Sequence, residues 1–305
     1  MIYTVTSSPS LDLILTLPTK LESGGNFRVV DEELRPGGKG INISIMLKNL
    51  GISSTALGFV AGFSGDELMR LSMACGINTG FIRVRRGRTR INIRVKDSRE
   101  TKINGLGPTV TPDDINYLIN KIKIIKDTDI LVLAGMVPPS LPQDIYKTFF
   151  ENIKPGTKVI VDTTPDVAAP LLKFKPFLVK PNLYELQDYL KTVLDTHDKV
   201  IDAARQVKAQ GAQNVLVSMG KSGAVFVDEH DRAYTIPAPG GDAVDRTGAG
   251  DSMIAGFIKD YLENNDLKSA AFMAVATGAA TATHNGIASK EYVQQLRDSM
   301  DKTDL

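Results

Sequence analysis

Short apolar runs alternate along the chain with segments whose apolar residues recur at helical spacing. The apolar runs are rich in β-branched side chains and cover residues 2–6, 55–60, 130–134, 159–161, 177–179 and 215–219. Runs of this kind predict strands that are buried on both faces of a parallel sheet. Helical spacing appears at residues 43–50, 68–75, 115–122 and 200–207, and from about 249 onward. Strands that alternate with helices favour a three-layer α/β/α fold with a mostly parallel central sheet.

Two segments, about 12–36 and about 88–104, break this alternation. Between Arg90 and Lys96 apolar and polar residues alternate strictly, and the turn-forming sequence Asp-Ser-Arg-Glu follows. This pattern is typical of a β-hairpin. We expect the two segments to form a small β-sheet, inserted as a lid into one domain that spans residues 1–305. The apolar side chains of the hairpin, Ile91, Ile93 and Val95, are expected either to pair with a second copy of the chain or to pack on the parent domain.

Composition and charge narrow the classes of function. The 305 residues include 36 Lys and Arg and 35 Asp and Glu, so a net charge of +1 gives no global field that recruits nucleic acid or an anionic membrane. A single cysteine excludes an internal disulfide and a multi-cysteine metal site. The sequence contains no apolar run long enough to span a bilayer and no signal-peptide pattern at its start. We therefore expect a cytoplasmic α/β protein that binds neither nucleic acid nor membrane.

The strongest chemical motif is Thr-Gly-Ala-Gly-Asp at residues 247–251, directly before a helical segment. Small residues let backbone N–H groups approach an anion, and the start of a helix favours negative charge. Asp251 falls in the first helical turn, where a carboxylate beside a phosphate is placed to accept a proton from an attacking hydroxyl. The alternative is a tight turn followed by an ordinary first-turn charge.

Three further segments carry candidate chemistry, each with a structural alternative. Gly-Gly-Lys-Gly-Ile-Asn at 37–42 precedes a helix and suggests close approach of a ligand, with Lys39 suited to a phosphate and Asn42 to a sugar hydroxyl. The alternative is a glycine-rich turn between a strand and a helix. In Lys-Pro-Asn-Leu-Tyr-Glu at 180–185, the oxygens of Asn182 and Glu185 suit Mg²⁺ that retains its waters, or else they cap a helix. In the basic segment 83–102, Arg90 at the start of the hairpin is the best candidate for binding phosphate.

Taken together, these motifs resemble the ribokinase family of carbohydrate kinases, also called the phosphofructokinase B family. The resemblance runs from Asp12 to the last helices, and its most specific feature is the early Gly-Gly-Lys-Gly-x-Asn followed later by Thr-Gly-Ala-Gly-Asp. Within the family, segments 1–6, 54–59, 89–92, 103–105 and 251–253 look like those of 1-phosphofructokinases, and tagatose-6-phosphate kinases are the next nearest group. The family fold is a three-layer α/β/α domain with a small β lid.

The resemblance implies a role for each matching residue. Asp251 would be the general base, and the backbone amides of Gly248, Ala249 and Gly250 would bind the transferring phosphoryl group. The residues implied to contact the sugar or its existing phosphate are Asp12, Arg28, Gly38, Lys39, Asn42 and Arg90. Those implied to contact ATP are Lys180, Asn182, Ser218, Gly220, Gly223 and Gly250, with residues 278–285 bordering the adenine. Asn182 and Glu185 would organise Mg²⁺ through water, and a role for K⁺ is left open.

The reaction most favoured by the resemblance is ATP-dependent phosphorylation of D-fructose 1-phosphate at its 6-hydroxyl. The alternatives are a kinase for tagatose 6-phosphate or fructose 6-phosphate, and a regulator that binds sugar phosphate without catalysis. Met136 departs from the family pattern, because a hydroxyl residue that touches the substrate is common there. A homodimer formed through the β lid is the one protein partner that the resemblance suggests.

Overall fold

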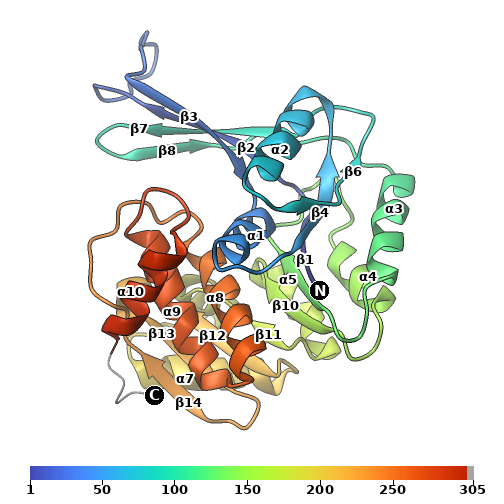
Figure 1. Cartoon of the computed structure of the whole chain (residues 1–305), viewed down its shortest axis with the longest axis vertical. Coiled ribbons are helices and arrows are strands. Elements are labelled where there is room, and N and C mark those ends of the chain that lie inside the picture. Colours follow the sequence, from blue (N-terminus) through green and yellow to red (C-terminus); the bar gives the residue numbers. More distant parts are fainter. Residues whose placement is uncertain (301–305) are drawn as a thin grey trace.

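A ten-stranded sheet forms the centre of the protein (Figure 1), whose computed structural model describes residues 1–300. The strand order is β14-β13-β12-β11-β10-β9-β1-β4-β5, and β6 also pairs with β4. The strands are β1 (Ile2–Thr6), β4 (Thr55–Val60), β5 (Asn78–Thr79), β6 (Ile82–Arg83), β9 (Ile130–Ala134), β10 (Lys158–Asp162), β11 (Leu178–Val179), β12 (Asn214–Ser218), β13 (Ala224–Val227) and β14 (Ala233–Ile236). All pairs are parallel except β12–β13 and β13–β14. The expected parallel sheet is confirmed, and an antiparallel pair extends one edge.

Both faces of this sheet are buried under helices. In β9, Leu131 and Leu133 pack into one hydrophobic cluster, whereas Ile130 and Val132 pack into a second on the opposite face. The first cluster includes side chains from α3 (Pro112–Lys123), α4 (Ile145–Asn152), α5 (Pro165–Ala168), η1 (Ala169–Phe174), α6 (Leu183–Leu190) and α7 (His197–Ala209). The second includes side chains from α1 (Lys39–Asn49), α8 (Ala249–Asn264), α9 (Leu267–Ala282) and α10 (Lys290–Ser299). The three-layer prediction is therefore confirmed.

The remaining helices lie near the edges and ends of the sheet. Helix α2 (Gly62–Ala74) contacts both β4 and the small sheet described next, and η2 (Gly220–Ser222) is a single turn between β12 and β13. Helix α3 begins as expected from its sequence, since the Thr111 hydroxyl accepts a hydrogen bond from the Asp114 N–H and the Asp114 carboxylate accepts one from the Thr111 N–H. Within residues 1–300, no helix is both long and apolar enough to cross a membrane.

A separate four-stranded sheet stands above the main body in Figure 1. Its order is β3-β2-β7-β8, with β2 (Ser10–Thr16), β3 (Asp31–Gly37), β7 (Arg90–Lys96) and β8 (Glu100–Ile103). The β2–β3 and β7–β8 pairs are antiparallel, and β2 runs parallel to β7. The two segments that break the strand–helix alternation thus build one small sheet, as expected.

The hairpin strand β7 does not bury its residues in the way that a simple alternating pattern suggests. The polar residues Asn92 and Arg94 are buried, while Ile91 and Ile93 are only half-buried and Val95 is buried. The reason is that Asn92 donates a hydrogen bond to Asp12, and Arg94 pairs with a carboxylate outside the small sheet. Charged partners elsewhere in the chain therefore decide which face of this strand meets the body.

The parallel strands place their carboxyl ends, and the residues that follow, along one edge of the main sheet. Ser7 follows β1, Asp162 ends β10, Lys180 follows β11 and Ser218 ends β12. Open α/β sheets bind their ligands at this edge. The small sheet and the start of α8 lie on either side of it, so the candidate site is expected there.

Candidate active site

The start of α8 forms an exposed set of backbone N–H groups. Gly248 caps the helix with φ of 79°, a left-handed conformation that favours glycine. A Cβ at this position would lie 2.6 Å from the Ile287 Cδ1, so close packing also requires a glycine. Ala249 and Gly250 follow as the first helical residues, and their amides have no acceptor within the helix, although the Ala249 N–H donates a long hydrogen bond of 3.3 Å to the Arg246 carbonyl in the preceding turn. This geometry suits an anion, as the sequence predicts.

Asp251 lies in the first turn of α8 and is buried. Its Oδ2 accepts a hydrogen bond of 2.7 Å from the Asn42 Nδ2 on α1. Burial raises the pKa of Asp251 to about 6, and the nearby charge of Asp162 adds to this effect, while Lys39, Asn42 and Lys180 oppose it. A carboxyl with this pKa is suited to exchange protons near neutral pH.

Asp162 is a central residue of the site that the sequence analysis did not identify. It ends β10, its side chain is fully buried, and its Oδ1 lies 2.9 Å from the Lys39 Nζ and 3.4 Å from the Lys180 Nζ. The Lys180 Nζ also lies beside the turn at residues 247–250, called the anion-binding turn below, since a Cβ at Gly250 would approach it to 3.2 Å. One carboxylate thus holds two ammonium groups next to the backbone amides of α8. Its position just after a buried strand was the available signal.

The charges of this cluster shift one another's pKa values. Burial favours the neutral form of Asp162, but the two lysines outweigh it and lower the pKa of this carboxyl. Burial likewise opposes the charge of Lys39, yet Asp162 and Asp251 outweigh it and raise the pKa of this ammonium group. Both Asp162 and Lys39 therefore remain charged at neutral pH, whereas Asp251 titrates.

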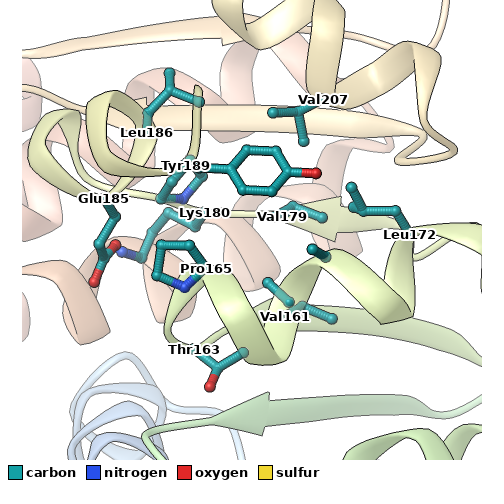
Figure 2. A pocket seen from close by; sticks show the side chains of 13 residues that line it. Val161, Thr163, Pro165, Leu172, Val179, Lys180, Glu185, Leu186, Tyr189 and Val207 are labelled. Carbon is teal, nitrogen blue, oxygen red and sulfur yellow. The ribbon is translucent and has the colours of Figure 1, made fainter. Parts of the chain in front are cut away.

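A small apolar cavity of about 30 Å³ lies behind Lys180 (Figure 2). Figure 2 shows Lys180 and Glu185 at one end of this cavity, and its other walls are side chains such as Val161, Leu172 and Tyr189. Apolar walls exclude water from the stem of Lys180, and Asp162 is the charged partner of its ammonium group. Electrostatic interactions are stronger in such a dry environment.

The residues expected to organise Mg²⁺ form a helix cap. The Asn182 Oδ1 accepts a hydrogen bond of 2.9 Å from the Glu185 N–H, and the Glu185 Oε2 accepts one of 2.8 Å from the Asn182 N–H. The capping alternative is therefore confirmed, but it uses only one carboxylate oxygen of Glu185. No group of three or more His, Cys, Asp or Glu side chains placed to hold a metal ion occurs within residues 1–300. The residues present thus fit a hydrated ion held mainly by a bound phosphate, with Glu185 as an outer contact.

A larger pocket of about 530 Å³ opens beside the anion-binding turn. It is lined on one side by residues 218–223 around η2 and on the other by α9. Five of the six predicted nucleotide contacts line it, namely Asn182, Ser218, Gly220, Gly223 and Gly250, and so does Gly278 from the segment expected to border the adenine. Ala282 and Thr283 continue the wall at the end of α9, and Arg246 is a lining residue that the sequence analysis missed. The size and the mixed lining suit a small organic ligand that carries phosphate.

On the other side of α1, the small sheet contributes a second group of polar side chains. The Asp12 Oδ1 accepts hydrogen bonds from the Ser10 hydroxyl at 2.8 Å and from the Asn92 Nδ2 at 2.9 Å. Asp12 also packs against Gly37, where a Cβ would lie 2.5 Å from its Oδ2. Gly38 follows with φ of 122° and caps α1. The start of α1 therefore lies between Asp12 on one side and Asp251 on the other.

Arg90 is a half-buried cation with few compensating groups. Its Nε donates a hydrogen bond of 3.1 Å to the Ser8 carbonyl, and Asp12 is the charged group that acts on it. Burial lowers the pKa of this guanidinium, and Asp12 offsets only part of that effect. A half-buried guanidinium whose positive charge is only partly compensated favours the binding of an anionic ligand.

The structure separates two predicted residues from the expected sugar phosphate. Arg28 is exposed on the segment between β2 and β3, which extends away from the body in Figure 1. The Lys39 ammonium group donates a hydrogen bond to Asp162 and interacts electrostatically with Asp251, rather than joining Arg90 at the expected phosphate site. Asn42 bonds Asp251, so it is placed to orient that carboxylate. The contacts of Arg28, Lys39 and Asn42 with a substrate stay predictions.

Comparison with known proteins matches the chain over nearly its whole length. A family model described as pfkB family carbohydrate kinase matches residues 6–292. The chain is 36% identical to a 1-phosphofructokinase of Bacillus subtilis, over 100% of both chains, and 34% identical to a D-tagatose-1-phosphate kinase of Bacillus licheniformis, also over 100% of both. Structures of phosphofructokinase-2 from Escherichia coli superpose with TM-scores of 0.89 to 0.90 at 27% identity, covering 98% of each chain. Their titles name complexes with fructose-6-phosphate and with potassium, and a tetrameric inhibited form.

The raised pKa of Asp251 predicts an acid limb in the pH profile of phosphoryl transfer. A general base works only when ionised, so kcat/KM is expected to fall as the pH drops below about 6. Asp251→Asn removes the base and is expected to lower kcat at least about 100-fold. Steady-state kinetics across this pH range measure both effects. The matched control is Asp202→Asn, which changes an exposed carboxylate paired with Arg205; near-normal kcat in Asp251→Asn would contradict the assignment.

Asp162→Asn is expected to move the same acid limb to lower pH. The charge of Asp162 raises the pKa of Asp251, so its removal favours the ionised base, provided that Lys39 and Lys180 keep their charges. The variant also leaves two lysines without their carboxylate and is expected to lower the free energy of unfolding by about 3 kcal/mol. The pH profile and chemical denaturation measure the two effects. If Asp162→Asn folds but its acid limb stays at the same pH, the charge of Asp162 does not raise the pKa of Asp251.

Proposed function

Because the chain belongs to the pfkB family of carbohydrate kinases, we propose that it transfers the γ-phosphoryl group of ATP to D-fructose 1-phosphate. The product is fructose 1,6-bisphosphate, and Asp251 is the general base. The observation that carries this proposal is the buried Asp251 at the start of α8, beside the backbone amides of the first helical turn and two lysines. Phosphoryl transfer needs these components, namely a positioned base, an anion site and cationic groups.

In the proposed reaction, the Asp251 carboxylate takes the proton of the sugar 6-hydroxyl. The hydroxyl oxygen forms a bond to the γ-phosphorus, the bond from that phosphorus to the β-phosphate oxygen breaks, and ADP leaves. The amides of Ala249 and Gly250 and the ammonium group of Lys180 stabilise the charge on the phosphoryl oxygens. Asn42 holds the carboxylate of Asp251 in place through its hydrogen bond.

The nucleotide would occupy the 530 Å³ pocket that opens beside the amides of α8. Its apolar wall on α9, around Gly278, suits adenine, and the anion-binding turn suits the phosphates. Mg²⁺, when bound to the phosphates, would neutralise charge that develops on them. Glu185 would contact the waters of that ion through the oxygen that the cap leaves unused. A role for K⁺ stays a prediction.

The small sheet would act as a lid over the sugar, within a single domain. Asp12 and Asn92 would bind sugar hydroxyls, and Arg90 would bind the existing phosphate as a half-buried cation. Closure of a lid excludes water from the transferring group and limits hydrolysis of ATP. Fructose 1-phosphate is preferred because full-length relatives at 30–36% identity are named 1-phosphofructokinases.

Other acceptors remain as alternatives within the same reaction. A relative of 34% identity is named for D-tagatose 1-phosphate, whereas the resemblance had suggested tagatose 6-phosphate. Met136 is half-exposed just beyond β9, and its carbonyl accepts a hydrogen bond from the Ser7 hydroxyl. A thioether cannot donate a hydrogen bond to phosphate. This favours an acceptor whose phosphate lies away from Met136. Intact Asp251, Asn182 and Glu185 argue against a regulator without catalysis.

A panel of acceptors tests the proposed substrate. Release of ADP from Mg-ATP is measured with fructose 1-phosphate, fructose 6-phosphate, tagatose 1-phosphate and tagatose 6-phosphate, with Asp251→Asn as the inactive control. We expect kcat/KM for fructose 1-phosphate to exceed the others by about tenfold or more, which is about 1.4 kcal/mol in transition-state binding. A higher value for another acceptor would reassign the substrate and keep the mechanism. Binding of sugar phosphate without turnover would support the regulator.

We also propose that the outer face of the small sheet pairs two copies of the chain. One apolar residue from each of its four strands is paired in register with the next, so these side chains share one face. They are Leu34, Leu13, Ile93 and Ile103. Leu34 and Ile103 are exposed at 38% and 55%, and the central two are half-buried. A continuous apolar row of this kind is rarely left in water. The tetramer named for the E. coli relative supports assembly of this fold into oligomers.

Leu34→Lys is expected to convert a dimer into a monomer. Lysine on this exposed strand places a charge in the proposed interface while leaving the fold of one chain intact. Light scattering coupled to gel filtration measures the mass, and Ile124→Lys, at an exposed apolar position outside the small sheet at the end of α3, is the control. A monomeric wild type, or a variant that stays dimeric, would contradict this interface.

A further inference from the structure

The Asp-Arg-Thr sequence that precedes the anion-binding turn has no role in the reaction proposed above. Asp245 stands two residues before Thr247, and its side chain is only 3% exposed. Its own N–H donates a hydrogen bond of 3.2 Å to the Ala282 carbonyl at the end of α9. A carboxylate that is buried at this point needs partners, because an unpaired buried charge is costly.

Cationic groups of the small sheet supply those partners. The Arg94 Nη2 donates a hydrogen bond of 3.1 Å to the Asp245 Oδ1. The Lys96 Nζ lies 3.7 Å and the Arg35 Nη1 3.9 Å from the other oxygen, Oδ2. Burial works against the ionised form, yet hydrogen bonds from Thr247 and Arg94 lower the pKa of Asp245, so the carboxylate stays charged. All three cations belong to β3 and β7.

Arg94 is held rigidly between two carboxylates. Its side chain is 7% exposed, and its Nε donates a hydrogen bond of 2.8 Å to the Glu100 Oε1 across the hairpin. By contrast, Arg83 on β6 pairs with Asp66 at the surface, where both side chains are more than half exposed. A buried, hydrogen-bonded pair fixes geometry in a way that an exposed pair does not.

The same Asp245 oxygen that binds Arg94 also fixes the anion-binding turn. The Thr247 N–H donates a hydrogen bond of 2.9 Å to the Asp245 Oδ1, and Thr247 directly precedes Gly248. The link therefore runs from Arg94 through Asp245 to the residues whose amides would hold the phosphoryl group. It joins positions 151 residues apart in the sequence.

Strand β7 connects this link to the sugar side. Every second residue of β7 lies on the face that packs toward the main sheet and its helices, and this face carries Arg90, Asn92 and Arg94. Asn92 bonds Asp12, and Arg94 bonds Asp245. One strand thus spans from the expected sugar contacts to the loop before α8.

We propose that Arg94 is a positioning residue, which couples the seating of the small sheet over the sugar to the geometry of the anion-binding turn by way of Asp245. This inference rests on the proposed kinase function. The consequence is a difference between two reactions. Loss of Arg94 is expected to slow phosphoryl transfer to the sugar more than it slows hydrolysis of ATP in the absence of sugar. Asp245 and Arg94 act as one unit, because Arg94 reaches the turn through Asp245 and is the cation of the small sheet that donates a hydrogen bond to the Asp245 oxygen bound to Thr247.

A double-mutant cycle tests the coupling. The variants are Arg94→Met, Asp245→Asn and the double variant, assayed with whichever acceptor the wild type uses best. Each single change is expected to lower kcat about tenfold or more, with a smaller change in KM, and the double variant is expected to be no slower than the slower single variant. The ratio of sugar phosphorylation to sugar-free ATP hydrolysis is expected to fall by a similar factor. Arg94→Lys, which keeps the charge, is expected to recover part of the loss.

Arg83→Met is the matched control and is expected to leave kcat and the ratio within about twofold of the wild type, as an exposed pair has little effect. Thermal unfolding checks that each variant is folded, and Arg94→Lys serves if Arg94→Met does not fold. Effects of Arg94→Met and Asp245→Asn that multiply in the double variant would overturn the coupling, as would a folded Arg94 variant with normal kcat and ratio. A wild type that transfers phosphate to no acceptor would instead overturn the proposed kinase function, and this inference with it.

Discussion

The site depends on one buried carboxylate, Asp162, which ends a central strand and holds two lysines. Because Asp162 is buried away from water, its negative charge has to be compensated by protein groups. Lys39 on α1 and Lys180 directly after β11 provide that compensation. Their positions then place positive charge beside the amides of α8, where a phosphoryl group would lie. The negative charge of Asp162 also favours the protonated form of Asp251. Asp162 therefore holds the positive charge that suits an anion and, in addition to burial, raises the pKa of Asp251.

The arrangement of the small sheet follows from the same requirement that buried charges be paired. Asn92 and Arg94 are buried because Asp12 and Asp245 accept their hydrogen bonds, and Ile91 and Ile93 are consequently left half-buried on the other face. Polar contacts thus orient the sheet toward the site, and the apolar row on its other face is the surface proposed to meet a second chain. A fold that placed the apolar face inward would leave Asp245 buried without Arg94.

Periodicity in the sequence predicts the parallel centre of the main sheet, most of its longer helices and the small sheet, because burial leaves a direct pattern of apolar residues. It does not predict the antiparallel strands β13 and β14 at the edge, nor helix α4. Glycine-rich segments likewise predicted the anion-binding turn, since only glycine permits the backbone of Gly248 in its packed position. Asp162 and the Arg94–Asp245 pair were not predicted, because each depends on a partner distant in the sequence. The alternation in β7 predicted a strand but not which face meets the body. The sequence predicts the cap formed by Asn182 and Glu185 as one of two alternatives, and the structure confirms it, whereas the Glu185 oxygen that the cap leaves unused is apparent only in the structure.

The central claim is that burial and the charge of Asp162 hold the Asp251 carboxyl protonated to higher pH than usual. Carbon-13 NMR of side-chain carboxyls in protein labelled at aspartate measures this directly, with Asp251→Asn identifying the signal that belongs to Asp251. The account predicts a carboxyl that titrates with a pKa of about 6 and is absent from the variant. A signal for Asp251 that titrates near the ordinary aspartate value of about 4 would contradict it.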